Sequence, residues 1–408
     1  EKAAPRVMNP RTHTLFPIEL NGGNQRLLSN AMEKETISVQ MGKRTCAKCG
    51  KISPMVICHH RILNQDGQEE AGLTCGGRTL MAVSKDKKKR RRGEVQNVNL
   101  TTLIEDARIK LGLDRIPRQI KCMKKIASRD QTPEALEKGL LRAKWELPVF
   151  RDGTVRFDMS DVPVTHFTPR EIGVTWQTIE SLGYTHDVEG NPLESDEQML
   201  EIFPQDFIVA KNAGEFFVRT AKFIDDLLVR YYGMEPYYNV NTPDDLVGQL
   251  ICALAPHTSG GVLSRLIGFS DSSGGYAHPL FHAAKRRNCD GDEDAIMLLM
   301  DGLLNFSREI LPSNRGGQMD APLVLTTRLN PTEVDKEALN VDSAWHYERW
   351  FYEATLDQPH PKVLSDRMDF VERRLGSVAA VRGLGFTHST KNMAEGPQLS
   401  AYKTLETM

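Results

Sequence analysis

Four of the seven cysteines lie close together in the sequence, and this cluster restricts the fold more than any other feature. They are Cys46, Cys49, Cys58 and Cys75. Two residues separate Cys46 from Cys49, the spacing at which two thiolates bind one tetrahedral Zn²⁺. An odd, crowded set of cysteines favours a metal site in a reducing compartment over a framework of disulfides. The sequence therefore predicts a structural zinc-binding module.

The second half of the predicted zinc site is irregular. Arg61 occupies the position three residues after Cys58, and the next cysteine is Cys75. We expect Cys75 to complete the site from a second knuckle that carries an insertion, with His59 or His60 as the replacement ligand if it does not reach. Because four protein ligands leave no open coordination position, the zinc would be structural. A module without metal is the alternative.

The composition is that of a globular protein. Apolar residues make up 40% of the chain and charged residues 26%, which excludes disorder throughout and a disulfide-rich miniprotein. A length of 408 residues allows two or three domains. The longest apolar stretch, residues 295–306, contains Asp301 and is too short to span a bilayer, so we expect no membrane partner. We expect small buried side chains at the isolated Cys122, Cys252 and Cys289.

Basic residues are clustered, although the net charge is only −2. Seven of the eight residues from Lys85 to Arg92 are basic, and Lys285, Arg286 and Arg287 form a second group. Such runs attract a phosphate backbone. For the first run, a solvated surface loop is the alternative interpretation.

The most informative segment contains Asp290 and Asp292, separated by one glycine. Two carboxylates in this arrangement can bind Mg²⁺, which takes one or two protein carboxylates together with phosphate oxygens. Paired Mg²⁺ ions activate a hydroxyl nucleophile and stabilise a pyrophosphate leaving group. The alternative is an acidic surface loop that caps a helix beginning near Asp294, since carboxylates favour helix N-termini. The preceding His278, His282 and basic residues favour the metal site.

The motifs of several other enzyme classes are absent from the sequence. It contains no Walker A motif, no Gly-x-Gly-x-x-Gly and no Gly-x-Ser-x-Gly, so ATPase, Rossmann oxidoreductase and serine hydrolase functions lose support. His257 opens a His-Thr-Ser-Gly-Gly stretch. That stretch would either present polar side chains to a ligand or form an ordinary turn.

Apolar periodicity and turn residues predict a mixed α and β chain. An Asp-Gly pair at residues 152–153 predicts a hairpin, and Thr132 followed by proline predicts a helix N-cap. The predicted helices cover residues 95–113, 220–232, 246–254 and 294–310, and a buried strand is predicted at 321–327.

Residues 274–294, GGYAHPLFHAAKRRNCDGDED, closely resemble the catalytic segment of the large subunit of archaeal family D DNA polymerase. Further stretches that resemble this family follow in family order along the whole chain: LEKGLLRAK at 136–144, DVPVTH at 161–166, LAPHTS at 254–259, GGQMDAP at 316–322 and SAYKT at 400–404. The family's subunit is much longer, so we expect this chain to be a piece of a larger protein.

The resemblance implies an α+β, β-rich fold with a catalytic core of two double-psi β-barrels, helical insertions and a zinc-ribbon module. We expect four regions in order along the chain: the end of the first barrel region at 1–40, a zinc-binding module at 41–80, a basic loop and helical connector at 81–145, and the second barrel region with the catalytic aspartates at 146–408.

The resemblance also implies a replicative DNA-directed DNA polymerase, which transfers nucleotides from dNTP to a primer 3′-hydroxyl by two-metal Mg²⁺ catalysis. Asp290 and Asp292 would bind Mg²⁺, and Asn288 would support the site. The residues expected to contact DNA or nucleotide are Lys285, Arg286, Arg287, His257, His282 and, at the end of the first barrel, Lys2. Expected partners are primer–template DNA, a small subunit with 3′→5′ exonuclease activity in a heterodimer, and a sliding clamp. We expect a cytoplasmic, nucleoid-associated protein.

Two other functions are compatible with the same residues. A non-catalytic, zinc-containing DNA-binding scaffold would keep the basic clusters and the cysteines and use the aspartates as a helix cap. An RNA polymerase-like enzyme would share the barrels, and its use of ribonucleotides would distinguish it.

Overall fold

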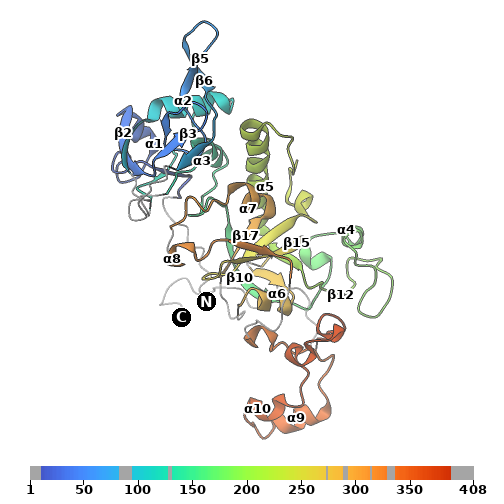
Figure 1. Ribbon diagram of the computed structural model, residues 1–408. Coiled ribbons are helices and arrows are strands. Elements are labelled where there is room, and N and C mark those ends of the chain that lie inside the picture. Colours follow the sequence, from blue (N-terminus) through green and yellow to red (C-terminus); the bar gives the residue numbers. More distant parts are fainter. Residues whose placement is uncertain are drawn as a thin grey trace.

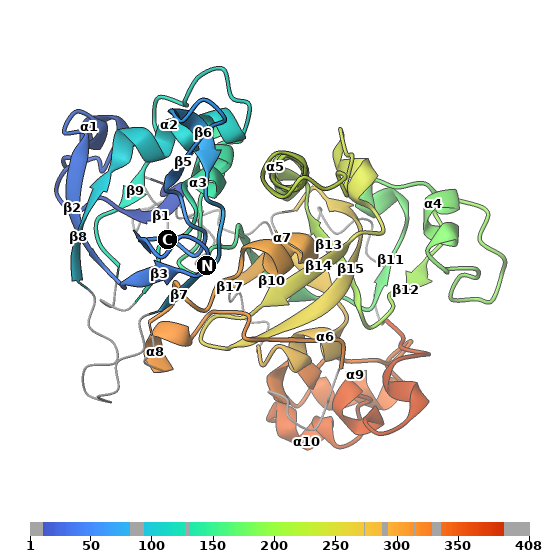
Figure 2. The ribbon, with the colours of Figure 1, turned by 45° about the horizontal axis from the view of Figure 1, so that its top comes forward.

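The chain folds into a β-rich N-terminal body, a central barrel and a C-terminal group of short helices (Figure 1). In a second view the N-terminal body and the barrel again lie side by side, with the C-terminal helices against the other side of the barrel (Figure 2). The computed structural model describes residues 11–81, 94–126, 131–272, 274–287, 293–312, 315–328 and 336–386.

Six strands of the central region form a closed barrel. They are hydrogen-bonded in the order β13-β16-β10-β17-β14-β15, and β15 pairs back with β13. The β10–β16 and β13–β15 pairs are parallel and the others are antiparallel. A seventh strand, β18, adds to β15. The bounds are β10 Phe157–Pro163, β13 Asp206–Ala210, β14 Leu250–Leu254, β15 Gly260–Ser270, β16 Gly274–Ala277, β17 Glu293–Leu298 and β18 Val324–Thr326.

Apolar side chains explain why these strands close. Every residue of β13 is buried, and β14 is buried from Ile251 to Leu254, as expected for strands covered on both faces. Gly275 of β16 lies where a Cβ would approach Phe207 and Met159 to less than 3 Å, so only glycine fits between these side chains.

One amphipathic helix covers the barrel on the side of the N-terminal body. Helix α5 (Lys211–Asp226) buries Phe217, Phe223 and Ile224 in the main core. It continues into a π-helical turn, η2 (Leu227–Tyr232), which ends at Gly233 in the left-handed conformation. The same hydrophobic core extends into the N-terminal body, so the two parts are packed together.

The N-terminal body is built around an antiparallel pair, β2 and β8. The cysteine-containing residues form an insertion between these two strands, made of the β3–β4–β7 sheet and the β5–β6 hairpin. Bounds in this body are β1 Thr14–Pro17, α1 Leu28–Met32, β2 Thr36–Met41, β3 Arg44–Cys46, β4 Ile52–Ser53, β5 Arg61–Leu63, β6 Glu69–Thr74, β7 Thr79–Met81, β8 Glu94–Asn99, α2 Leu100–Lys110, β9 Cys122–Met123 and α3 Leu136–Lys144.

A buried arginine connects this body to the barrel. Arg142 of α3 pairs with Glu134 at 2.7 Å, and both side chains are almost fully buried. Its guanidinium also donates to the Gly153 carbonyl at 2.8 Å, in the turn just before β10. Because both charges are satisfied, the connection is compatible with burial.

The remaining elements are short. Among the described residues, no helix is long and apolar enough to cross a membrane. Their bounds are β11 His166–Phe167, η1 Arg170–Ile172, α4 Trp176–Ser181, β12 Leu200–Glu201, η3 Pro243–Leu246, α6 Pro279–Ala284, α7 Leu299–Asn305, α8 Arg315–Gln318, η5 Lys336–Leu339, α9 Arg349–Thr355, α10 Pro361–Ser365, η6 Val371–Arg374 and η7 Val378–Ala380.

Three predicted helices are wrong at least in part, for one shared reason. Residues 250–254 form β14 instead of a helix, residues 293–298 form β17 before α7 begins, and residues 94–99 form β8 before α2 begins. Each segment is a short apolar or alternating run whose periodicity fits either state. Pairing with β15, β10 and β2 respectively decides in favour of a strand.

Other local predictions are partly confirmed. The strand at 321–327 appears as β18, and the helix at 220–232 is present but begins at Lys211. The Asp-Gly turn forms, with Gly153 N–H donating to Phe150 O, but a strand begins only at Phe157. Thr132 is not the N-cap of α3, since that helix begins at Leu136 after Ala135.

Candidate functional site

The segment predicted to be catalytic connects α6 to β17. Asn288, Asp290 and Asp292 lie outside the described residues, as does Lys2. The residues on both sides are described, and Ser160 of β10 pairs with Glu293, the first residue of β17. The segment is therefore attached to the barrel at the start of β17.

His257 belongs to the same end of the barrel. It lies in the loop between β14 and β15, three residues beyond Leu254, which pairs with Ala295 of β17. Because the pairing is antiparallel, the end of β14 lies beside the start of β17. His257 itself is exposed and left-handed, with φ 62°, and its N–H donates to Asp320.

Four ionisable side chains meet beneath this end of the barrel. Asp161 comes from β10, His282 from α6, Lys285 from the residue after α6, and Asp294 from β17. All four are buried. Ligand atoms of Asp161, His282 and Asp294 lie within 4.8 Å of one another, and the Lys285 ammonium forms an ion pair with Asp294. We call these residues the buried charge cluster.

Helix α6 sets the position of the histidine in this cluster. The helix begins at Pro279, and the imidazole of His278 caps it by accepting the Leu280 N–H at 3.1 Å. His282 follows one turn later on the same face. Its Nε2 donates to the Val162 carbonyl at 2.9 Å, while Nδ1 lies 3.7 Å from Asp161 Oδ2. Burial, followed by the nearby Lys285 charge, holds the pKa of His282 well below its usual range.

The three basic residues after α6 have different environments. Lys285 is buried, Arg286 is exposed with φ 62°, and Arg287 is half-buried. The Arg287 guanidinium donates to the Glu293 carbonyl at 3.4 Å, so it reaches across from one side of residues 288–292 to the other. Of the predicted phosphate contacts, the structure thus leaves Arg286 and His257 exposed and encloses His282 and Lys285.

The helix-cap interpretation of the acidic segment is wrong. Asp294 lies in β17 and pairs in register with Met159 of β10. The next helix, α7, begins only at Leu299, with Leu298 as its N-cap. An acidic loop here therefore has no helix N-terminus to stabilise.

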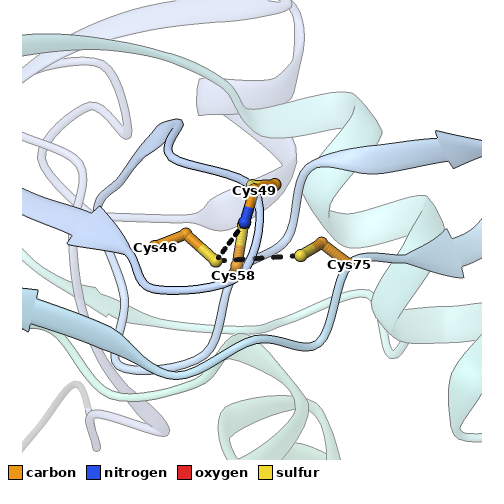
Figure 3. Close-up of side chains that lie close together, drawn as sticks. All are labelled: Cys46, Cys49, Cys58 and Cys75. Carbon is orange, nitrogen blue, oxygen red and sulfur yellow. Dashed lines mark hydrogen bonds between the residues drawn. The ribbon is translucent and has the colours of Figure 1, made fainter.

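The four predicted cysteine ligands converge. The Sγ atoms of Cys46, Cys49, Cys58 and Cys75 lie within 4.8 Å of one another. The Cys46–Cys75 separation is 3.7 Å and the Cys49–Cys58 separation is 3.6 Å. Figure 3 shows the side chains directed to one point between the loops that carry them. Cys75 thus reaches the cluster despite the insertion.

The spacing of these sulfurs suits a tetrahedral metal. Four sulfurs at about 2.3 Å from Zn²⁺ would lie about 3.8 Å apart. Cys46 Sγ also accepts the N–H groups of Lys48 and Cys49 at 3.3 and 3.5 Å. The Cys49 N–H is the main cause that lowers the pKa of Cys46 to about 6, which favours the thiolate that binds metal. His60 is not needed as a ligand, since its Nε2 donates to Ile52 O.

The other cysteines agree with the simpler expectation where they are described. Cys122 and Cys252 are buried, and burial raises the pKa of Cys252 to about 12. Both behave as small apolar residues. Cys289 lies outside the described residues.

Sequence reasoning missed Asp161 and Asp294 as members of a buried cluster. In the sequence Asp161 is a lone carboxylate just before the largely apolar run Val162–Val164, and Asp294 is one of several acidic residues. A single charge in a short strand gives no periodic signal. Only the pairing of β10 with β16 and β17 brings the two carboxylates together.

Comparisons with known proteins agree with this arrangement. Residues 113–408 match the family described as "DNA polymerase II large subunit DP2, catalytic domain". Residues 1–70 match "DNA polymerase II large subunit DP2, central domain".

Curated relatives carry the same name over the full length of this chain. Proteins named DNA polymerase II large subunit from Methanococcoides burtonii, Archaeoglobus fulgidus and Pyrococcus furiosus are 48%, 47% and 45% identical to it. The matches cover 100% of this chain and 36%, 36% and 33% of the respective relatives. The chain thus spans about a third of the length of these relatives.

Proposed function

This chain belongs to the family of archaeal DNA polymerase II large subunits, and on that premise we propose that it forms part of the catalytic core of a DNA-directed DNA polymerase. The observation that carries the proposal is the match of residues 113–408 to the family's catalytic domain. The acidic segment between α6 and β17 belongs to that match.

In the proposed reaction the primer 3′-hydroxyl attacks the α-phosphate of a dNTP and pyrophosphate leaves. Asp290 and Asp292, supported by Asn288, would hold Mg²⁺, whose charge would stabilise the transferring phosphoryl group. Arg286 and His257, both exposed at this end of the barrel, are placed to contact triphosphate or primer phosphates. Lys2 would contribute from the first barrel.

The buried charge cluster supports this chemistry from below. Lys285 stands at one side of residues 288–292 and Asp294 at the other, so their ion pair holds the two sides together. His282 ties α6 to β10 through the Val162 carbonyl. We propose that Lys285 and His282 act mainly by fixing the catalytic segment, because preorganised charges need supporting contacts to stay in place.

The finer features of the family are proposals of the same kind. The parallel β10–β16 and β13–β15 pairs in a closed six-stranded barrel support a double-psi topology. The cysteine cluster would hold a structural Zn²⁺. A small subunit with 3′→5′ exonuclease activity, a sliding clamp and association with the nucleoid follow from the family resemblance.

The test is Mg²⁺-dependent primer extension by the complete large subunit with its small partner. Asp290→Asn and Asp292→Asn should each reduce extension by at least about 10³-fold, because each removes charge from the metal site. Binding of primer–template DNA, measured by fluorescence anisotropy, should stay within about twofold.

Asp357→Asn is the matched control, since Asp357 is an exposed residue just after α9. It should leave both extension and binding unchanged. Undiminished extension by both active-site variants would contradict the catalytic assignment and favour the DNA-binding scaffold. Incorporation of ribonucleotides in preference to deoxynucleotides would favour the RNA polymerase-like alternative.

A further inference from the structure

A pocket of about 470 Å³ lies in the N-terminal body, apart from the barrel. One wall comes from the cysteine module, through β4 and the residues after Cys58, and the other from β8 and the start of α2. Its volume falls in the range of roughly 300–1,000 Å³ that is usual for ligand sites. Neither the barrel chemistry nor the cysteine cluster makes use of it.

The lining is basic and partly apolar. Lys43, Lys51 and Arg61 face one carboxylate, Glu69. The N-terminal end of α2 also borders the pocket, and its first turn contains no acidic residue. Three cations and a helix N-terminus together favour an anion. Apolar side chains of β4, β8 and α2 supply a surface for a less polar group.

Two buried polar atoms in the lining have no hydrogen-bond partner within the part of the chain that is described. Ser53 is fully buried, yet its hydroxyl is unpaired. Nε2 of His59 is likewise buried and unpaired. Leaving such groups unsatisfied costs roughly 1–3 kcal/mol each, so they indicate a ligand that supplies hydrogen-bonding atoms.

The walls are held in position independently of any ligand. Arg61 binds Asp106 of α2 through paired contacts of 2.8 and 2.9 Å, and the same carboxylate accepts the Gly72 N–H at 2.8 Å. Asp106 is itself buried. The cysteine module is therefore fixed against α2, and the pocket between them is preformed.

We propose that this pocket binds one nucleotide unit, with the phosphate near Lys43 and Lys51 and the base against the apolar wall and the Ser53 hydroxyl. A base combines a flat apolar face with polar edges, which fits the mixed lining. The unit can come from a single DNA strand or from a free nucleotide. The inference rests on the proposed function only in taking DNA as the first source.

The experiment uses the 408-residue chain with two probes, a fluorescein-labelled dT12 oligonucleotide and unlabelled dAMP. Val95→Trp fills the mouth of the pocket, because Val95 lines it and is largely exposed. Val378→Trp adds the same side chain at another exposed valine and is its control. Val95→Trp should weaken binding of at least one probe by about tenfold relative to Val378→Trp.

Two further variants examine charge and hydrogen bonding. Lys51→Glu should reduce the slope of log affinity for dT12 against log salt by about 0.7, the value for one phosphate that the lysine neutralises. Lys362→Glu, at an exposed position on α10, should not. Ser53→Ala should weaken the same probe several-fold, whereas a purely structural hydroxyl with no partner would leave affinity unchanged.

The outcomes separate the sources. A fall in dT12 affinity identifies a DNA strand, and a fall in dAMP affinity alone identifies a free nucleotide. Equal affinity of Val95→Trp and Val378→Trp for both probes would overturn the proposal, as would inorganic phosphate competing as well as dAMP. Because only binding is measured, active Asp290→Asn enzyme would refute the catalytic proposal without affecting this one.

Discussion

The cysteine cluster and the buried charge cluster both bring metal-binding side-chain types together, but they do so with opposite chemistry. In the first, four sulfurs stand at separations close to those of a tetrahedral zinc site. In the second, two carboxylates and an imidazole also lie within 4.8 Å, but an ammonium group from Lys285 is paired with one of the carboxylates. The protein itself thus supplies a cation to the second cluster.

The comparison shows that proximity of ligand types does not define a metal site. Thiolates crowded together repel one another until a cation binds, so the first cluster is completed only by metal. In the second cluster Lys285 already offsets the charge of Asp294 in a buried environment. We therefore expect the first to depend on metal for its stability and the second to depend on its own ion pair.

Removing a sulfur from the first cluster should have the largest effect. Cys58→Ser should abolish stoichiometric zinc and unfold the insertion between β2 and β8, since zinc contributes about 10 kcal/mol to the folding of comparable small modules. Zinc content by mass spectrometry and hydrogen exchange of residues 44–81 would measure this. Cys252→Ala is the control, because that cysteine is buried away from the cluster. Full zinc content in Cys58→Ser would contradict the assignment.

Removing the internal cation should have the next largest effect. Lys285→Met should destabilise the fold by about 3–5 kcal/mol, because it leaves Asp294 buried without its partner. Denaturant unfolding would measure the decrease in stability. Adding Asp294→Leu should recover a large part of it, since an uncharged pair has no desolvation cost.

An exposed ion pair provides the contrast for this measurement. Arg349 and Glu353 of α9 pair at 2.7 Å with both side chains largely exposed. Arg349→Ala should cost less than about 1 kcal/mol. A similarly small decrease in Lys285→Met would show that the buried pair does not hold the segment.

Sequence reasoning worked best where spacing alone carries the chemistry. The pair Cys46 and Cys49 predicted the cysteine cluster, and the geometry confirms that Cys75 completes it. It failed where long-range pairing decides the structure, as for β14 and β17, which were predicted as helices. The barrel could be inferred only through the family resemblance, because no local pattern specifies which strands are neighbours.

The same limit applies to the candidate site. The acidic segment stands out as a motif, but the residues beneath it do not. Asp161 and Asp294 are brought together by the register of β10 with β17, and the burial of His282 and Lys285 follows from packing of α6. Motif reasoning placed these two cations on phosphate because charge is normally exposed, and it had no signal for an internal partner.

A third buried carboxylate, Asp301 of α7, sharpens the comparison because its direct partners are neutral. It accepts the Val155 N–H at 2.6 Å and the Asn305 amide at 2.8 Å. Burial raises its pKa from the usual 3.8 to about 6. The folded state therefore holds this proton more tightly than the unfolded state, and the group destabilises the fold as the pH rises from about 4 to 6.

Linkage converts that shift into about 3 kcal/mol, lost between pH 4 and 6 and constant above. Unfolding free energies of the wild type and Asp301→Asn should be compared across this range, because other carboxylates cancel in the difference. The wild type should lose stability relative to the variant as the pH rises. A difference independent of pH would mean that Asp301 is ionised in the fold. More distant charges such as Arg142 would then compensate its burial, as Lys285 does directly for Asp294.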